Sequence, residues 1–76
     1  MKISGTKSYI RVSDFEGKSM IIKGEMTMNG FVAEKTTMTQ WEDPNSQILV
    51  TDNERERIIK AIIEETKSKN FKIQFE

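Results

Sequence analysis

The chain has 76 residues with twelve basic and twelve acidic side chains, so its formal net charge is zero. This balance argues against a protein built mainly to hold nucleic acid, which needs an excess of basic residues. The lack of cysteine and histidine removes disulfides, the usual thiol nucleophile, the usual base at neutral pH and the usual transition-metal ligands. No apolar run approaches membrane-spanning length and the first residues lead into no signal segment. We therefore expect one cytoplasmic domain over residues 1–76.

The first predicted strand covers Ser8–Ser13. Its alternation places Tyr9 and Arg11 on one face, and Ile10 and Val12 on the other. One face of this strand should therefore be buried and the other exposed.

A second extended segment is predicted over Lys18–Met28, after a turn at Asp14–Gly17 in which the glycine can take a positive φ. Four apolar residues of this segment share one parity across Gly24: Met20, Ile22, Met26 and Met28.

Asn29-Gly30 is a strong signal for a type I′ hairpin turn, since both residues tolerate left-handed conformations. The returning strand is predicted over Phe31–Trp41. Counting outward from this turn sets Glu25 opposite Glu34, and two like charges across a ladder are unfavourable. A bulge at Gly24 or a looser loop would relieve that pairing. The alternative is that the two carboxylates await a cation or a basic partner.

After a loop at Pro44–Val50, with a short extended piece near Gln47–Val50, Thr51 to Glu54 match a capping box that opens a helix ending near Ser68. Its buried stripe is predicted from four isoleucines at helical spacing: Ile58, Ile59, Ile62 and Ile63. Phe71, Ile73 and Phe75 then alternate with polar residues, as in a terminal strand with one buried face.

These elements predict an α+β domain. Its small antiparallel sheet has about four strands, in the order β-β-β-α-β, and one amphipathic C-terminal helix packs on one face of it.

The only tryptophan and the only proline lie in one acidic stretch, Trp41-Glu42-Asp43-Pro44. Between Glu42 and Glu56 the chain has five acidic residues and one basic residue. A large aromatic residue beside carboxylates suits the binding of a basic partner, because the ring supplies contact area and the carboxylates supply steering. The simpler interpretation, favoured for Trp41 alone, is that its ring closes the core. Gly24 and Trp41 are interpreted as structural residues.

The candidate partner-binding residues are six carboxylates: Glu42, Asp43, Asp52, Glu54, Glu56 and Glu34, the last as an outlying member. Asp52 and Glu54 also suit the first turn of a helix through the helix dipole. Glu56 has Lys60 as a helical partner. Only Glu42 and Asp43 have no evident structural role in the sequence, and they rank first.

Catalysis is not expected. The remaining option is a carboxylate pair such as Glu25 with Glu34, or Glu42 with Asp43, and that spacing alone predicts nothing. No phosphate loop, nucleophile elbow or calcium loop is present, so we expect no enzyme, no metal site and no cofactor.

Two other functions fit the pattern. A nucleic-acid-binding module would use Tyr9, Arg11 and neighbouring lysines on one strand face. A homo-oligomeric scaffold would pair the terminal strand, Phe71–Glu76, with a second copy, although Lys72 is a common edge-protecting residue.

The order of several short motifs resembles the immunity protein 74 family. The matching segments are Ser8-Tyr9-Ile10-Arg11-Val12, Gly17-Lys18, Gly24-Glu25-Met26, Gly30-Phe31-Val32-Ala33-Glu34, Trp41-Glu42-Asp43-Pro44, Arg57-Ile58-Ile59 and Ile73-Gln74-Phe75-Glu76. Each motif is short, and their order and spacing from Ser8 to Glu76 carry the resemblance. One departure is Asn45, where the family pattern has a second proline after Pro44.

The resemblance implies a small bacterial protein of a polymorphic toxin system that inhibits a cognate toxin domain, as in contact-dependent growth inhibition. Toxins of such systems are often nucleases with a basic active site, which an acidic inhibitor surface can cover. The implied partner is thus a basic protein, with no direct binding to nucleic acid or membrane. The chain itself would be a monomer or weak dimer.

Overall fold

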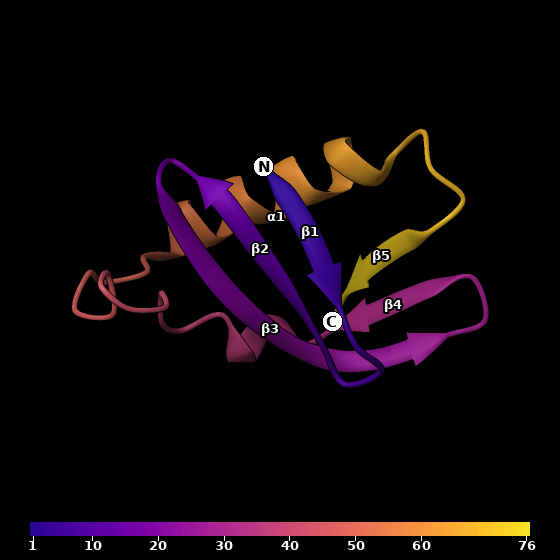
Figure 1. The fold of residues 1–76 in the computed structure, drawn as a ribbon, viewed down its shortest axis with the longest axis horizontal. Coiled ribbons are helices and arrows are strands. Elements are labelled where there is room, and N and C mark those ends of the chain that lie inside the picture. Colours follow the sequence, from indigo (N-terminus) through magenta and orange to yellow (C-terminus); the bar gives the residue numbers. More distant parts are fainter.

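The computed structural model describes all residues 1–76 and shows a five-stranded sheet curled around one helix (Figure 1). In chain order the elements are β1 (Lys2–Gly5), β2 (Tyr9–Phe15), β3 (Lys18–Thr27), β4 (Gly30–Ala33), the 3₁₀ turn η1 (Lys35–Thr37), α1 (Asp52–Thr66) and β5 (Lys72–Phe75). The strands follow one another across the sheet in chain order. The predicted α+β fold with one C-terminal helix is confirmed.

The alternation predicted for the first strand is confirmed in β2. Ile10 and Val12 are buried, whereas Tyr9 and Arg11 are exposed on the outer face of the sheet. The predicted turn follows, with φ of +80° at Gly17. This hairpin was therefore predicted correctly from local sequence signals.

The long strand β3 belongs to two parts of the sheet. Its first half pairs with β2, and its second half, from Gly24 onward, pairs with β4. A Cβ atom at Gly24 would lie 2.1 Å from the carbonyl oxygen of Val32, so only glycine fits this crossing. The β3–β4 ladder begins at Gly24 and has no register shift, so the position is a close approach of two strands and no bulge is present.

The predicted turn at Asn29-Gly30 is wrong, because the turn lies one residue earlier in the chain. Thr27 pairs with Gly30, so the turn residues are Met28 and Asn29, and neither Asn29 nor Gly30 has a positive φ. Gly30 is instead a buried strand residue, where an added Cβ would lie 1.9 Å from the carbonyl oxygen of Lys72 in β5. The contact with β5 thus sets the register.

The new register removes the expected clash of carboxylates. Glu25 lies opposite Val32 and not opposite Glu34. The predicted strand Phe31–Trp41 is also too long, because β4 ends at Ala33. The hydroxyl of Thr37 donates to the carbonyl of Glu34 at 2.8 Å and accepts from the backbone N–H of Lys23 at 3.0 Å. The hydrogen bonds of the Thr37 hydroxyl take the place of further strand pairing, and the chain continues as η1.

Two features of the sheet differ from the prediction. The N-terminal residues form an additional strand, β1, which pairs with β2 and makes the order β-β-β-β-α-β. The terminal strand β5 is parallel to β4, so the sheet is mixed and not purely antiparallel. A parallel neighbour is possible because the chain crosses from β4 to β5 through α1.

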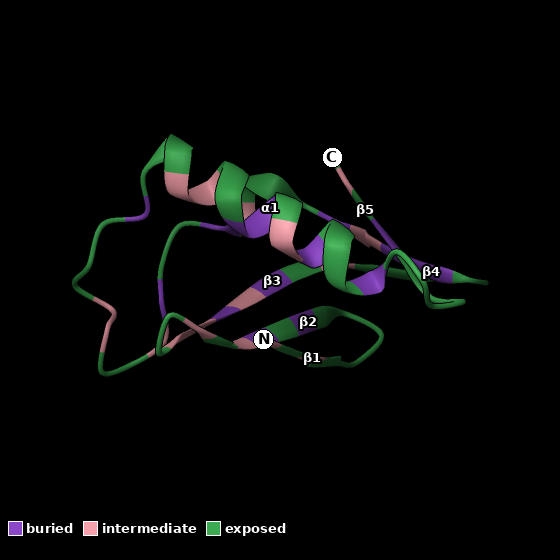
Figure 2. Cartoon of the chain, turned by 90° about the horizontal axis from the view of Figure 1, so that it is seen from above, coloured by how far each residue is buried: buried purple, intermediate pink, exposed green.

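The helix lies over the inner face of the curled sheet, with β1 and β5 at opposite sides (Figure 2). Thr51 caps it as predicted, accepting a hydrogen bond from the backbone N–H of Glu54 at 3.1 Å. Ile58, Ile59 and Ile62 are buried, but Ile63 is 47% exposed, so the predicted stripe is one residue too wide. No helix has the length and apolarity that a membrane crossing requires.

Candidate functional site

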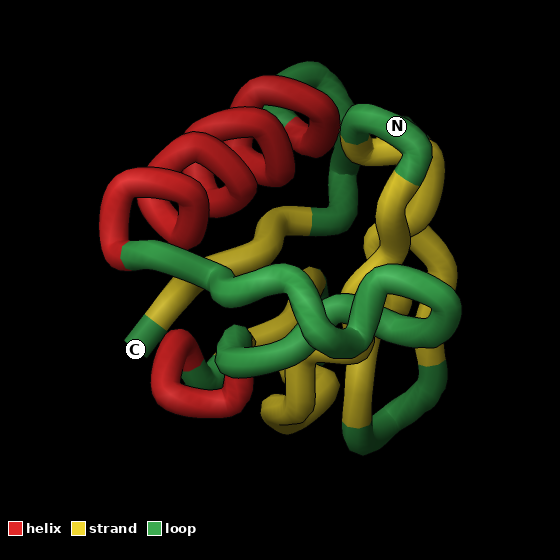
Figure 3. The backbone as a smooth tube through the Cα atoms, turned by 90° about the vertical axis from the view of Figure 1, so that its left-hand side faces the viewer, coloured by secondary structure: helices red, strands yellow, loops and turns green.

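The loop between η1 and α1 and the first turns of α1 lie at the same end of the molecule (Figure 1). The molecule measures 35 × 21 × 19 Å, and Figure 3, which faces this end, shows the loop crossing in front of the sheet with α1 beside it. We call this region the acidic end and define it by Glu42, Asp43, Asp52, Glu54 and Glu56. Five of the six candidate carboxylates therefore come from one end of the fold.

Glu42 has a structural role that the sequence did not reveal. Its carboxylate accepts a hydrogen bond from Arg11 Nε at 2.7 Å, and its backbone N–H donates to the carbonyl of Ser19 at 2.8 Å. Both partners come from strands of the sheet, so these bonds fasten the start of the loop to β2 and β3. The charge of Glu42 is largely offset by Arg11.

Asp43 is also engaged locally. It accepts a hydrogen bond from the hydroxyl of Ser46 at 2.7 Å, and the Asp43–Pro44 peptide bond is cis. The prediction that only Glu42 and Asp43 lack a structural role is therefore wrong. Asp43 nevertheless remains exposed and has no cationic partner.

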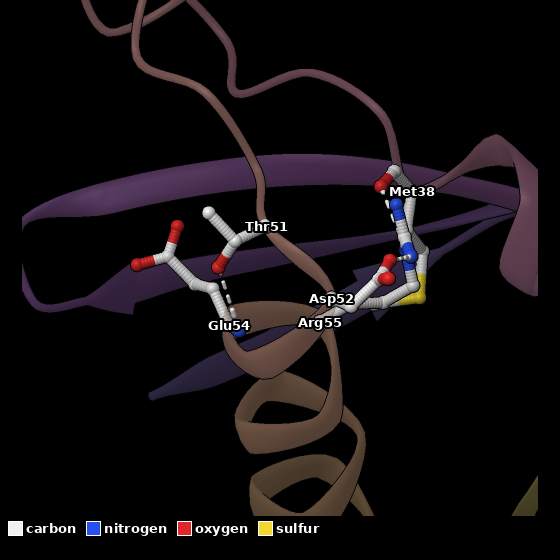
Figure 4. A network of polar contacts seen from close by, with 5 residues as sticks. All are labelled: Met38, Thr51, Asp52, Glu54 and Arg55. Carbon is white, nitrogen blue, oxygen red and sulfur yellow. Dashed lines mark hydrogen bonds and ion pairs between the residues drawn. The ribbon is translucent and has the colours of Figure 1, made fainter.

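The first turn of α1 carries an ion pair and a cap side by side (Figure 4). Arg55 Nη1 donates to the Asp52 carboxylate at 2.6 Å, and Arg55 Nε donates to the carbonyl of Met38 at 3.3 Å. These bonds tie the helix start to the chain just after η1. The Glu54 carboxylate points away from the cap and makes no hydrogen bond, so only the threonine half of the capping box forms.

Glu54 and Glu56 are thus the carboxylates of the acidic end with no hydrogen-bonded or ionic partner. Lys60 does not reach Glu56 as an ion pair. Glu34 lies apart, at the end of β4, with an exposed side chain and backbone bonds to Lys23 and Thr37. The structure therefore gathers five candidates and leaves Glu34 outside the group.

Trp41 lies in the core and not on the surface, with 1% of its area exposed. Its ring stacks on Phe15 with centroids 6.1 Å apart, and Lys18 Nζ lies 5.0 Å from the ring centroid. The ring closes the core at the end of the β2–β3 hairpin. It cannot also serve as an aromatic contact for a partner.

Two apolar side chains of the loop take the exposed position instead. Leu49 is 78% exposed and Ile48 is 45% exposed, and Leu49 is held in place by a bridge to Gln40. Sequence reasoning missed both, because an Ile-Leu-Val run normally indicates burial, and only Val50 of this run is buried. Ile48 and Leu49 lie between Asp43 and Asp52 in the chain, so the loop that joins these carboxylates exposes two apolar side chains.

A hollow of about 730 Å³ lies beside the start of this loop. Its lining includes the carboxylate residues Glu42 and Asp43, the hydroxyl residues Thr37 and Thr39, and one cation, Lys23. A space of this size and polarity can receive a side chain of a partner.

The charges elsewhere are distributed unevenly. Each of the three arginines forms an ion pair, Arg11 with Glu42, Arg55 with Asp52 and Arg57 with Glu16, and none of the nine lysines does. Pairing of Arg11 weakens the basic strand face that a nucleic-acid-binding module would need. No group of three or more acidic residues is arranged to hold a metal ion.

The fold and the surface define a small α+β protein with an acidic end and two exposed apolar residues, Ile48 and Leu49, in the loop of that end. The chain matches the immunity protein 74 family over residues 2–76, essentially its whole length, and belongs to that family. No curated protein and no solved structure matches it. The family assignment indicates an immunity protein of a toxin–immunity system, with a cognate toxin as its partner.

Proposed function

We propose that this chain neutralises a basic, nuclease-type toxin domain by tight binding through its acidic end, in contact-dependent growth inhibition or a related polymorphic toxin system. It acts without catalysis, as a monomer or weak dimer, in the cytoplasm where the delivered toxin meets its substrate. The observation that carries the proposal is the exposure of Leu49 and Ile48 in a loop flanked along the chain by carboxylates, because protein interfaces combine an apolar core with a polar rim.

Each part of the surface has a distinct physical role. Glu54 and Glu56, which have no partner in the free protein, are available for charge-assisted bonds to the toxin and for steering it in solution. Asp43, next to the hollow, can pair with a lysine or arginine that enters it. Leu49 supplies contact area that is solvated in the free protein and desolvated in the complex.

Local rigidity makes this surface suitable for tight binding. The Glu42 bonds to β2 and β3 hold one end of the loop, and the Arg55 bonds hold the other end. A loop fixed at both ends loses little conformational entropy when it binds.

The test is the affinity for the polypeptide encoded immediately upstream, measured by calorimetry at two salt concentrations, together with protection of cells from that polypeptide. Glu54→Lys combined with Glu56→Lys should weaken binding about a hundredfold or more, as charge reversal at a steered interface does. The matched control is Glu64→Lys combined with Glu65→Lys, which makes the same charge change on the same helix away from the acidic end.

The outcomes separate the possibilities. Equal weakening by both double variants would show that only net charge matters and would remove the acidic end from the proposal. No complex at all, with salt-dependent binding of RNA by the isolated chain, would overturn the immunity function itself.

A further inference from the structure

A second surface, at a distance from the acidic end, is apolar and basic. A groove of about 330 Å³ runs between β1 and the region where α1 ends. Its lining combines apolar side chains from four parts of the fold with the last residue of the helix and one lysine: Ile3, Ile10, Met26, Phe71, Thr66 and Lys69. We call it the β1 groove.

The β1 groove is an uncovered part of the inner face of the sheet. Met26 pairs with Phe31, which is buried, so both side chains point to the same face. Met26 is nevertheless 46% exposed, because α1 ends at Thr66 and contributes no other residue to the groove. Phe71 is also exposed. The groove thus continues the hydrophobic core to the surface.

One wall of the β1 groove is a free sheet edge. β1 pairs only with β2, and no backbone group of Lys2–Gly5 bonds to any segment other than β2. Ser4 and Gly5 of this strand line the groove. An extended segment laid along the edge could therefore make backbone hydrogen bonds and bury side chains in the groove at the same time.

The rim of the β1 groove is positively charged. Lys69 lines it and no carboxylate does. Lys7 lies beside it, since its carbonyl accepts from the backbone N–H of Met26 at 3.0 Å. Neither lysine has a carboxylate partner. A second copy paired along β1 about a two-fold axis would bring these lysines against each other, whereas a segment with carboxylates would neutralise them.

We propose that the β1 groove binds an extended segment of the cognate toxin that carries apolar and acidic side chains, and that this segment pairs with β1 as a sixth strand. This inference rests on the proposed function, because the occupant is the same toxin. The apolar side chains of the segment cover Met26 and Phe71, and its carboxylates lie against Lys69 and Lys7. The toxin would then be held at two separate surfaces of opposite charge.

The test uses the whole chain, labelled with ¹⁵N and with ¹³C at the methionine methyl groups, together with the polypeptide encoded immediately upstream. Binding should slow amide hydrogen exchange in Lys2–Gly5 and shift the methyl resonance of Met26. Met26→Glu should weaken the complex about tenfold or more, the loss typical of a central contact. Ile63→Glu is the matched control, because Ile63 has nearly the same exposure and does not line the groove.

The results distinguish this inference from the proposed function. In one outcome the complex is lost in the Glu54 and Glu56 double variant, is unaffected by Met26→Glu, and gives no protection of the β1 amides. This result would support the immunity function and overturn the proposal that the β1 groove binds the toxin. Weakening by Ile63→Glu equal to that by Met26→Glu, or self-association of the free chain with protection of β1, would also overturn it. Absence of any complex would overturn both proposals.

Discussion

Truncation of Trp41 should remove a large part of the stability of this domain. The side chain is 1% exposed, and a buried tryptophan removes about 150–250 Å² from water, which at about 25 cal/mol per Å² corresponds to roughly 4–6 kcal/mol. Measured costs of Trp→Ala in cores are about 3–5 kcal/mol. A chain of 76 residues has a free energy of unfolding of only about 4–11 kcal/mol. We therefore expect Trp41→Ala to lower it by about 3–5 kcal/mol.

A second variant at this position separates the ring from its N–H group. Trp41 Nε1 is buried without a hydrogen-bond partner, and burial of such a donor costs about 1–3 kcal/mol. Trp41→Phe removes that cost and keeps the stacking on Phe15, so it should lose less than about 2 kcal/mol, within the usual range of point variants.

The assay is urea unfolding followed by far-ultraviolet circular dichroism, since Trp41 is the only tryptophan and its fluorescence is lost in both variants. A loss below about 1 kcal/mol for Trp41→Ala would refute the assignment of the ring to the core. Equal losses in the two variants would refute the argument about the unpaired N–H. If Trp41→Ala does not fold, a loss above about 2 kcal/mol for Trp41→Phe would refute the second point.

Two further predictions concern α1. Thr51→Ala should lower the free energy of unfolding by about 1 kcal/mol, because it removes the helix cap. Thermal melting measures the loss, and Thr36→Ala is the control because the Thr36 side chain makes no hydrogen bond. Ile63→Lys should change stability by no more than about 0.5 kcal/mol, whereas Ile62→Lys, at a fully buried position, should prevent folding. A similar loss of stability in both lysine variants, measured by urea unfolding, would contradict the exposure of Ile63 and support the wider buried stripe predicted from the sequence.

Features set by neighbouring residues were predictable from the sequence. The alternation in β2, the turn at Gly17 and the Thr51 cap each depend on a few consecutive residues, and each was predicted in the right place. The terminal strand was predicted correctly only in part, because Ile73 is buried but Phe71 lies outside β5 and is exposed. The α+β class and the family follow from the order of these short signals.

Features set by distant contacts were not predictable. The register of β3 with β4 depends on β5 approaching Gly30 more than forty residues later in the chain, and this contact overrides the local turn signal. The end of β4 depends on the bonds of Thr37 to Lys23. A short edge strand such as β1 has little pattern of its own and is recognised only from its pairing with β2.

The candidate site shows the same division. The sequence determined the acidic stretch and its five carboxylates, because charge is a property of composition. Which of those charges are free was decided by the tertiary structure, through Arg11, which lies 31 residues from Glu42 and yet pairs with it. Packing likewise buried Trp41 and left Leu49 exposed. A single sequence records which side chains exist, and the folded chain decides which of them reach solvent, because burial depends on neighbours that only folding brings together.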